Sequence, residues 1–161
     1  KTYIPIHGRL DKVTKFVEQG VLTPEIDAPW SEIEGLGFDH EENEEDQDSL
    51  VEALLSFFKI KKQRDGKYLP QRNISLKPFV LLFDEFYTDL YRINEAQRRM
   101  LLADKMVFIG TSFSVNITSM ALDVAISKGI SIEIVDPKPI EISYKNASYF
   151  EMSAVEYIEK N

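Results

Sequence analysis

Four short polar stretches of this 161-residue sequence each follow an apolar segment, and each could take part in chemistry. They are His7-Gly8, Asp84-Glu85, Gly110-Thr111-Ser112 and Asp136. An imidazole can act as a general base near neutral pH, hydroxyls beside a glycine can approach a phosphate or a sugar, and a carboxylate can bind both hydroxyls of a ribose. Ligands of parallel α/β sheets bind beyond the carboxyl ends of the strands, so such residues are candidates for a common site.

Each stretch also has a purely structural interpretation. An ordinary strand-to-helix turn would contain Gly110 and its hydroxyl neighbours, with Ser114 or Asn116 capping the helix that follows. Asp136 precedes a proline and suits a turn, and a lone histidine such as His7 is more often structural than catalytic. Residue types alone therefore leave both interpretations open.

The spacing of apolar residues predicts the elements that would position these stretches. Strands are expected over residues 2–8, 77–83, 106–110 and 130–136, and helices over residues 10–20, 49–62, 87–105, 116–129 and 154–160. Buried strands joined by helices favour right-handed crossovers and a parallel sheet. The predicted fold class is therefore α/β, a Rossmann-like parallel sheet flanked by helices.

Composition excludes several classes of protein. The formal net charge is -8 and the pI is about 4.8, so the chain repels phosphate backbones and we expect no nucleic-acid partner. There are no cysteines, which removes disulfides, thiolate nucleophiles and cysteine-ligated zinc. No apolar run approaches the roughly 18 residues of a membrane span. We expect a cytoplasmic protein without a membrane partner.

An acidic run, DHEENEEDQD, occupies residues 39–48. Blocks of like charge are usually solvated or disordered loops, which is the interpretation that the sequence favours. A cation site is the alternative, but the run lacks the glycine turn and the closing glutamate of a calcium loop.

Four segments, taken in order, resemble a known family. They are IHG at residues 6–8, LKPFVLLFDE at 76–85, ADKMVFIGTSFSV at 103–115 and IEIVDPKP at 132–139. This order is similar to the carboxyl-terminal part of the catalytic domain of sirtuins, which are NAD-dependent protein-lysine deacylases. The resemblance covers residues 3–8 and roughly 76–161.

The resemblance implies a role for each matching residue. His7 would be the general base that activates a ribose hydroxyl of NAD. The adenosine side of the NAD site would be formed by Gly110, Thr111, Ser112, Asp136, Met152 and Ser153. Asp136 stands where the family usually has an asparagine, and Met152 would begin the segment that closes over adenine in the family. An acylated protein or peptide would add as a strand to Val80, Leu81, Leu82 and Phe83.

The resemblance also implies an organisation of the chain. Residues 1–8 and 76–161 would form the Rossmann-like part, and residues 9–75 would form a mostly helical insertion in place of the zinc module. The four zinc cysteines of the family are absent, so no metal is expected.

The phosphate-binding Gly-Ala-Gly loop and the nicotinamide-site residues of sirtuins have no counterpart here. We therefore expect a partial, truncated domain that is inactive by itself and that could form a homo-oligomer through exposed apolar surface. The expected function is that of a part of an enzyme transferring an acyl group from lysine to ADP-ribose. An NAD hydrolase of the same fold and a non-catalytic module that binds ADP-ribose or a protein are the alternatives.

Overall fold

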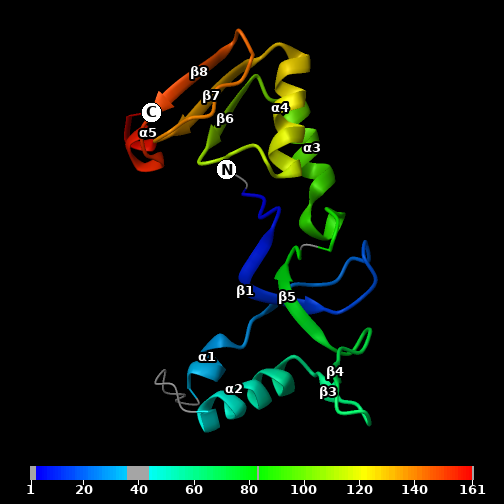
Figure 1. Cartoon of the computed structure of the whole chain (residues 1–161). Coiled ribbons are helices and arrows are strands. Elements are labelled where there is room, and N and C mark those ends of the chain that lie inside the picture. Colours follow the sequence, from blue (N-terminus) through cyan, green and yellow to red (C-terminus); the bar gives the residue numbers. More distant parts are fainter. Residues whose placement is uncertain (1–2, 36–43, 83, 161) are drawn as a thin grey trace. The chain divides into compact units, whose positions relative to one another are not determined.

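A computed structural model describes residues 3–35, 44–82 and 84–160 of the chain. The chain forms two compact units, Lys1–Ile93 and Asn94–Asn161 (Figure 1). The division into residues 1–8 with 76–161 and an insertion 9–75, which the resemblance implies, stays a prediction.

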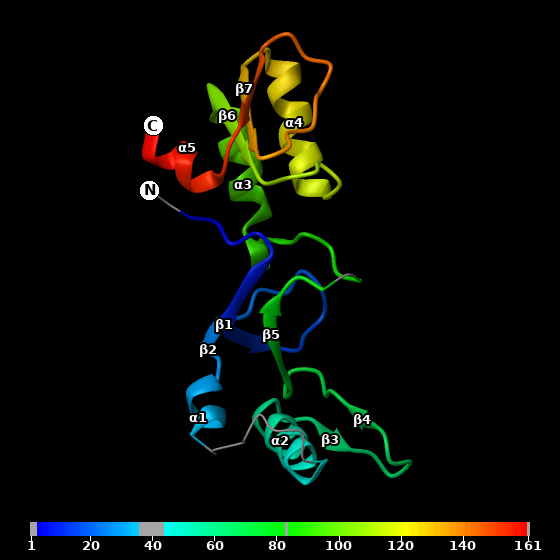
Figure 2. The same cartoon turned by 60° about the vertical axis from the view of Figure 1, so that its left-hand side comes forward.

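The carboxyl-terminal unit is built around a parallel sheet. Its elements are α3 (Ile93–Leu102), which begins at the last residue of the other unit, β6 (Lys105–Ile109), α4 (Asn116–Lys128), β7 (Ser131–Asp136), β8 (Ala147–Glu151) and α5 (Ala154–Lys160). The strands lie in the order β6-β7-β8, and both pairs are parallel. Helices α4 and α5 lie on opposite faces of this sheet (Figure 2). The predicted α/β class, a parallel sheet flanked by helices, is confirmed.

Alternation along the strands explains this arrangement. Met106 and Phe108 of β6, with Ile132 and Ile134 of β7, point to one face and pack against Ala125 of α4. The helix ends where its pattern of apolar residues ends, because Gly129 adopts the left-handed conformation (φ 70°) and caps it, as the sequence predicts.

Strand β8 was not predicted. Its segment, ASYFE, is short and half-exposed, and residues 137–146, which connect it to β7, contain no helix. A crossover between parallel strands usually contains a helix, so the sequence offered no reason to place a third parallel strand here.

The amino-terminal unit contains an antiparallel sheet in the order β2-β1-β5. Its elements are β1 (Gly8–Lys15), β2 (Ile26–Asp27), α1 (Trp30–Glu34), α2 (Glu44–Phe57), β3 (Lys61–Lys62), β4 (Tyr68–Leu69), β5 (Leu76–Val80) and the 3-10 helix η1 (Asp89–Tyr91). Residues 9–75 thus hold α1 and α2 together with most of β1.

Two predictions for the start of the chain are wrong. Residues 3–7 form no strand, because Ile6 N and Gly8 N donate to nearby carbonyls, those of Ile4 and Pro5, in tight turns. The helix expected over residues 10–20 is largely strand β1 instead. The β-branched Val13 and Thr14 are completely buried there by pairing with β5, which overrides the weak helical spacing.

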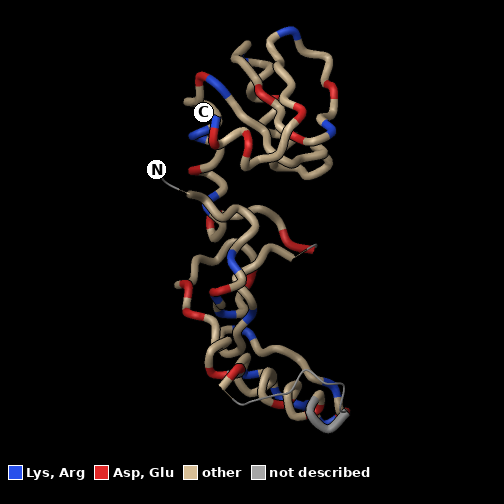
Figure 3. The backbone as a smooth tube through the Cα atoms, turned by 90° about the vertical axis from the view of Figure 1, so that its left-hand side faces the viewer, with Lys and Arg blue, Asp and Glu red and all other residues tan. Residues whose placement is uncertain are grey.

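Other expectations need smaller corrections. The run at 77–83 does contain a strand, β5, but it pairs antiparallel with β1 and belongs to a different sheet from β6–β8. The last residues of the expected acidic loop, 44–48, form the first turns of α2, while residues 39–43 lie outside the described residues. Over the described part of the chain, acidic and basic residues are interspersed (Figure 3), and no helix is long and apolar enough to cross a membrane.

Candidate functional site

The polar residues expected to bind a nucleotide lie at one edge of the parallel sheet. Ile109 pairs with Val135, and Asp136 pairs with Glu151, so the three carboxyl ends are neighbours. Gly110 N donates to Val135 O at 3.0 Å, which places the turn after β6 beside Asp136. The structure therefore brings residues 110–112, Asp136 and the segment starting at Met152 to adjacent strand ends.

The turn after β6 depends on Gly110. Its φ is +61°, a conformation that favours glycine, and no atom lies within 4 Å of the position a Cβ would take. The exposed backbone can therefore be approached closely. Ser112 Oγ lies 2.7 Å from Ser114 Oγ, and Phe113 N donates to Thr111 Oγ1 at 3.2 Å.

The expected capping of α4 by Ser114 or Asn116 is wrong. The residue at the cap position is Val115, and no side chain caps the helix. Asn116 is already the first helical residue, and the Ser114 hydroxyl bonds Ser112 instead. The Ser112 and Ser114 hydroxyls are thus engaged with each other and the Thr111 hydroxyl with Phe113 N, and none of them caps α4.

Asp136 has one oxygen engaged and one available. Oδ1 accepts a hydrogen bond from Lys138 N at 2.8 Å, which is the turn role that the sequence suggested. No hydrogen bond from a described residue reaches Oδ2. The two interpretations of Asp136 are therefore compatible, since a ribose hydroxyl could still bind the second oxygen.

Ser153 begins helix α5 as its cap. Ser153 N and Oγ donate to Glu156 Oε2 at 2.8 and 2.9 Å, and Glu156 N donates back to Ser153 Oγ at 3.2 Å. Bonds from the Ser153 backbone and hydroxyl hold the pKa of Glu156 below its ordinary value. The spacing S-x-x-E is the signature of a capping box and could have been recognised in the sequence. Met152, directly before it, is half-buried.

An ion-paired network holds α5 against the sheet. Glu133 of β7 accepts hydrogen bonds from Lys105 of β6 and from Tyr157 of α5, and these bonds lower the pKa of Glu133. Hydrogen bonding to Glu133, followed by burial, raises the pKa of Tyr157. This network fixes the helix that carries Met152 and Ser153 at its amino end. Sequence reasoning missed it, because its members lie on three separate elements.

His7 is exposed in the amino-terminal unit, and Tyr87 is its partner. His7 Nε2 lies 2.8 Å from Tyr87 Oη, and the two rings are 5.7 Å apart between centroids. The backbone carbonyl of His7 accepts a hydrogen bond from Leu81 N at 3.0 Å. The structure therefore places the expected base beside the expected peptide strand.

Gly8 explains why a glycine follows the histidine. Its φ is +89°, and a Cβ at this position would lie 1.9 Å from Phe79 O. Only glycine allows β1 to approach β5 so closely, and this approach positions His7 next to Leu81.

The backbone of the expected peptide strand is partly occupied. Tyr91 Oη donates to Val80 O at 2.9 Å, and Leu82 N donates to Glu85 Oε2 at 3.1 Å. Pro78 has no N–H to offer. Phe83, the last residue expected in this strand, lies outside the described residues.

Glu85 anchors this arrangement. Its carboxylate is ion-paired with Lys77 and is largely shielded from solvent. Burial would raise the pKa of Glu85, but the bonds from Lys77 and Leu82 N outweigh it and the pKa is lowered. Burial, reinforced by Glu85, raises the pKa of Tyr91.

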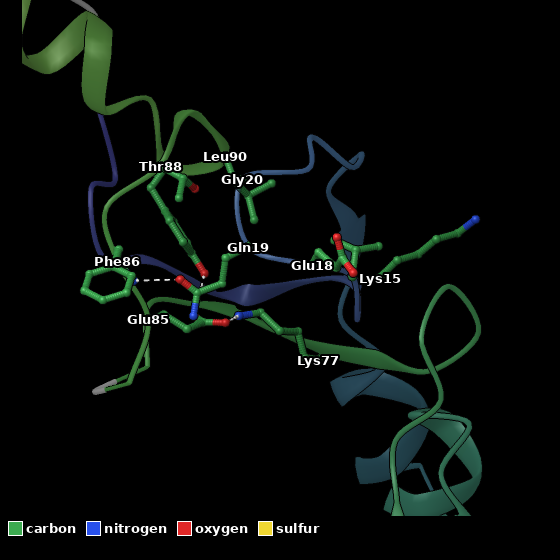
Figure 4. Close-up of a pocket in the computed structure, with 11 residues that line it drawn as sticks. Lys15, Glu18, Gln19, Gly20, Lys77, Glu85, Phe86, Thr88 and Leu90 are labelled. Carbon is green, nitrogen blue, oxygen red and sulfur yellow. Dashed lines mark hydrogen bonds and ion pairs between the residues drawn. The ribbon is translucent and has the colours of Figure 1, made fainter.

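A small pocket lies beside this ion pair (Figure 4). The Gln19 side-chain amide bridges two backbone groups there. Its oxygen accepts a hydrogen bond from Phe86 N and its nitrogen donates one to Asp84 O, each at 3.3 Å. A larger groove of about 760 Å³ shares Gln19 and Glu85 and is otherwise lined mainly by apolar side chains, including Trp30, Phe58 and Leu82. Within the described ranges, no group of three or more histidine, aspartate or glutamate residues could hold a metal ion.

Comparison with known proteins gives a likeness in structure alone. No family model matches the sequence, and no curated protein matches it. A structure of Sir2 with a p53 peptide and NAD+ aligns with a TM-score of 0.61 at 15% identity, over 99% of this chain and 54% of that one.

Two further sirtuin structures align with this chain about equally well. One, on the structural basis for sirtuin substrate affinity, aligns with a TM-score of 0.60 at 16% identity, over 99% of this chain and 55% of that chain. Another, on the mechanism and regulation of Sir2 enzymes, aligns with a TM-score of 0.57 at 21% identity, over 99% and 54%. The chain has a sirtuin-like fold, and it spans about half the length of these solved structures.

Proposed function

We propose that this chain is part of a sirtuin-type protein-lysine deacylase that uses NAD to transfer an acyl group from lysine to ADP-ribose. The convergence of residues 110–112, Asp136 and Met152 at one edge of a parallel sheet carries the proposal, because this is where such sheets bind nucleotides. The sirtuin-like fold supports the same assignment.

The residues at this edge fit the adenosine part of NAD. Gly110 offers open backbone, and the free Oδ2 of Asp136 can accept a hydrogen bond from a ribose hydroxyl. NAD, when bound, would supply the sugar carbon that receives the acyl group. His7 would take the proton from a ribose hydroxyl, and an acylated peptide would lie along Val80, Leu81, Leu82 and Phe83. No metal takes part in these roles.

Calorimetry on the 161-residue chain tests nucleotide binding. We expect ADP-ribose to bind, and Asp136→Ala to weaken its affinity about 10-fold or more, because a hydrogen bond to a charged group contributes about 1.5–3 kcal/mol. Asp123→Ala, on the exposed surface of α4, is the matched control and should bind like the unchanged chain. An absence of heat at millimolar ADP-ribose would contradict the proposal.

One observation favours an NAD hydrolase of the same fold as a second candidate. Tyr91 and Glu85 occupy Val80 O and Leu82 N, which are main-chain groups that an added peptide strand would need. With the peptide excluded, water would take the place of the acyl oxygen. Nicotinamide release is measured on the longer enzyme of which this chain is proposed to be a part, because the chain by itself is expected to be inactive. Release that is unaffected by an acylated peptide supports hydrolysis, and release that requires the peptide supports deacylation. Binding of ADP-ribose to that enzyme without any release supports the non-catalytic module.

A further inference from the structure

The contact between His7 and Tyr87 joins two residues that are far apart in the sequence. Their 2.8 Å contact is the one hydrogen bond that His7 makes through its ring to the described residues. Among these residues, no other titratable or charged side chain is hydrogen-bonded to the imidazole.

Other contacts hold the backbone segments that carry His7 and Tyr87. Gly8 packs closely against Phe79 O, and the His7 carbonyl accepts a hydrogen bond from Leu81 N. The chain on the other side is fixed by Phe86 N, which donates to Gln19 Oε1, and by Tyr91 N, which donates to Thr88 O at 3.0 Å. The contact is therefore built into the unit and does not depend on two loosely placed side chains.

The chemistry of the two groups indicates which one donates. A phenol O–H is a strong donor, and a neutral imidazole has one nitrogen that accepts. Burial raises the pKa of Tyr87, which favours retention of its proton. A bond from Tyr87 to Nε2 satisfies both groups and leaves the imidazole proton on Nδ1.

We propose that Tyr87 is a positioning and relay residue for His7, donating to Nε2 and holding the ring in the tautomer that is protonated at Nδ1. In the proposed reaction, a ribose hydroxyl of NAD would give its proton to the Tyr87 oxygen while the Tyr87 proton would pass to Nε2. One ribose O–H bond would break with its electron pair left on the ribose oxygen, one N–H bond would form, the imidazole would become a cation, and the tyrosine would be unchanged.

The proton relay through Tyr87 rests on the proposed function, but the tautomer of His7 does not. Imidazole nitrogen NMR on the 161-residue chain, at a pH where histidine is neutral, measures the tautomer directly. The chain has two histidines, so the signals that disappear in His7→Gln are those of His7. We expect the Nδ1-protonated form for His7.

The variant Tyr87→Phe removes the hydroxyl and keeps the ring. The ratio of Nδ1- to Nε2-protonated forms should fall about fivefold or more, as expected for loss of one typical hydrogen bond. Tyr68→Phe, on the exposed strand β4, makes the same chemical change away from His7 and should leave the ratio unchanged. The indole signal of Trp30 checks that each variant is folded.

Two results would overturn the inference. One is an Nε2-protonated His7 in the unchanged chain, a result that stands even if Tyr87→Phe does not fold. The other is an unaltered ratio in folded Tyr87→Phe. If the tautomer is as expected while ADP-ribose does not bind, the proposed function fails and the structural assignment of Tyr87 stands.

Discussion

Replacing Gly8 by alanine should destabilise the amino-terminal unit through two separable effects. The left-handed conformation at φ +89° costs a residue with a Cβ roughly 1–2 kcal/mol. The new methyl group would also lie 1.9 Å from Phe79 O, so β1 and β5 must separate locally. Separation weakens backbone hydrogen bonds such as Leu81 N to His7 O, at about 1 kcal/mol each. We expect a total loss of about 2–4 kcal/mol in the free energy of unfolding.

The chain contains a matched control for this change. Gly20 has φ +87°, almost the same as Gly8, but nothing lies within 4 Å of its added Cβ. Gly20→Ala therefore carries the conformational cost alone, about 1–2 kcal/mol. The difference between the two variants measures the close approach of β1 and β5.

Urea unfolding followed by tryptophan fluorescence is a suitable assay. Trp30 is the only tryptophan, and its indole N–H donates to Leu10 O in β1 at 2.6 Å, so its emission reports on this unit. At a typical slope, the midpoint should fall by about 1–2 M urea for Gly8→Ala and by less for Gly20→Ala. Equal losses in the two variants would refute the argument that the contact with Phe79 requires a glycine after His7.

Three further predictions concern helix α5, the sheet and the strand proposed to receive a peptide. Ser153→Ala removes the cap of α5 and should cost about 1 kcal/mol, measured by amide exchange in α5, whereas Ser153→Asp should retain most of the protection. Because the pKa of Glu133 is lowered in the folded chain, its contribution to folding stability is complete above its ordinary pKa of about 4.3 and is lost as the pH falls through the folded value. Acid unfolding of Glu133→Gln should therefore depend less on pH below about 5 than acid unfolding of the unchanged chain or of the control Glu141→Gln. Tyr91→Phe frees Val80 O and should strengthen binding of an acylated peptide about fivefold in a fluorescence titration, and an unchanged affinity would show that Tyr91 does not block this strand.

Local patterns in the sequence determined most of the carboxyl-terminal unit. Strands β6 and β7 alternate buried and outward residues, and α4 follows a helical spacing that ends at Gly129, so neighbouring residues suffice to define these elements. The placement of residues 110–112 and Asp136 at one edge followed from the same patterns, because parallel strands end on the same side. The sequence also contained the capping box of Ser153 and Glu156, although its spacing was not recognised.

Tertiary structure decided what depends on partners distant in the chain. Residues 10–15 have apolar spacing that suits a helix, and only pairing with β5 makes them a strand with Val13 and Thr14 buried. The hydrogen bond between His7 and Tyr87 joins residues 80 positions apart, and the network around Glu133 joins three elements. Such contacts depend on the path of the chain between their members, which no local pattern of residues encodes.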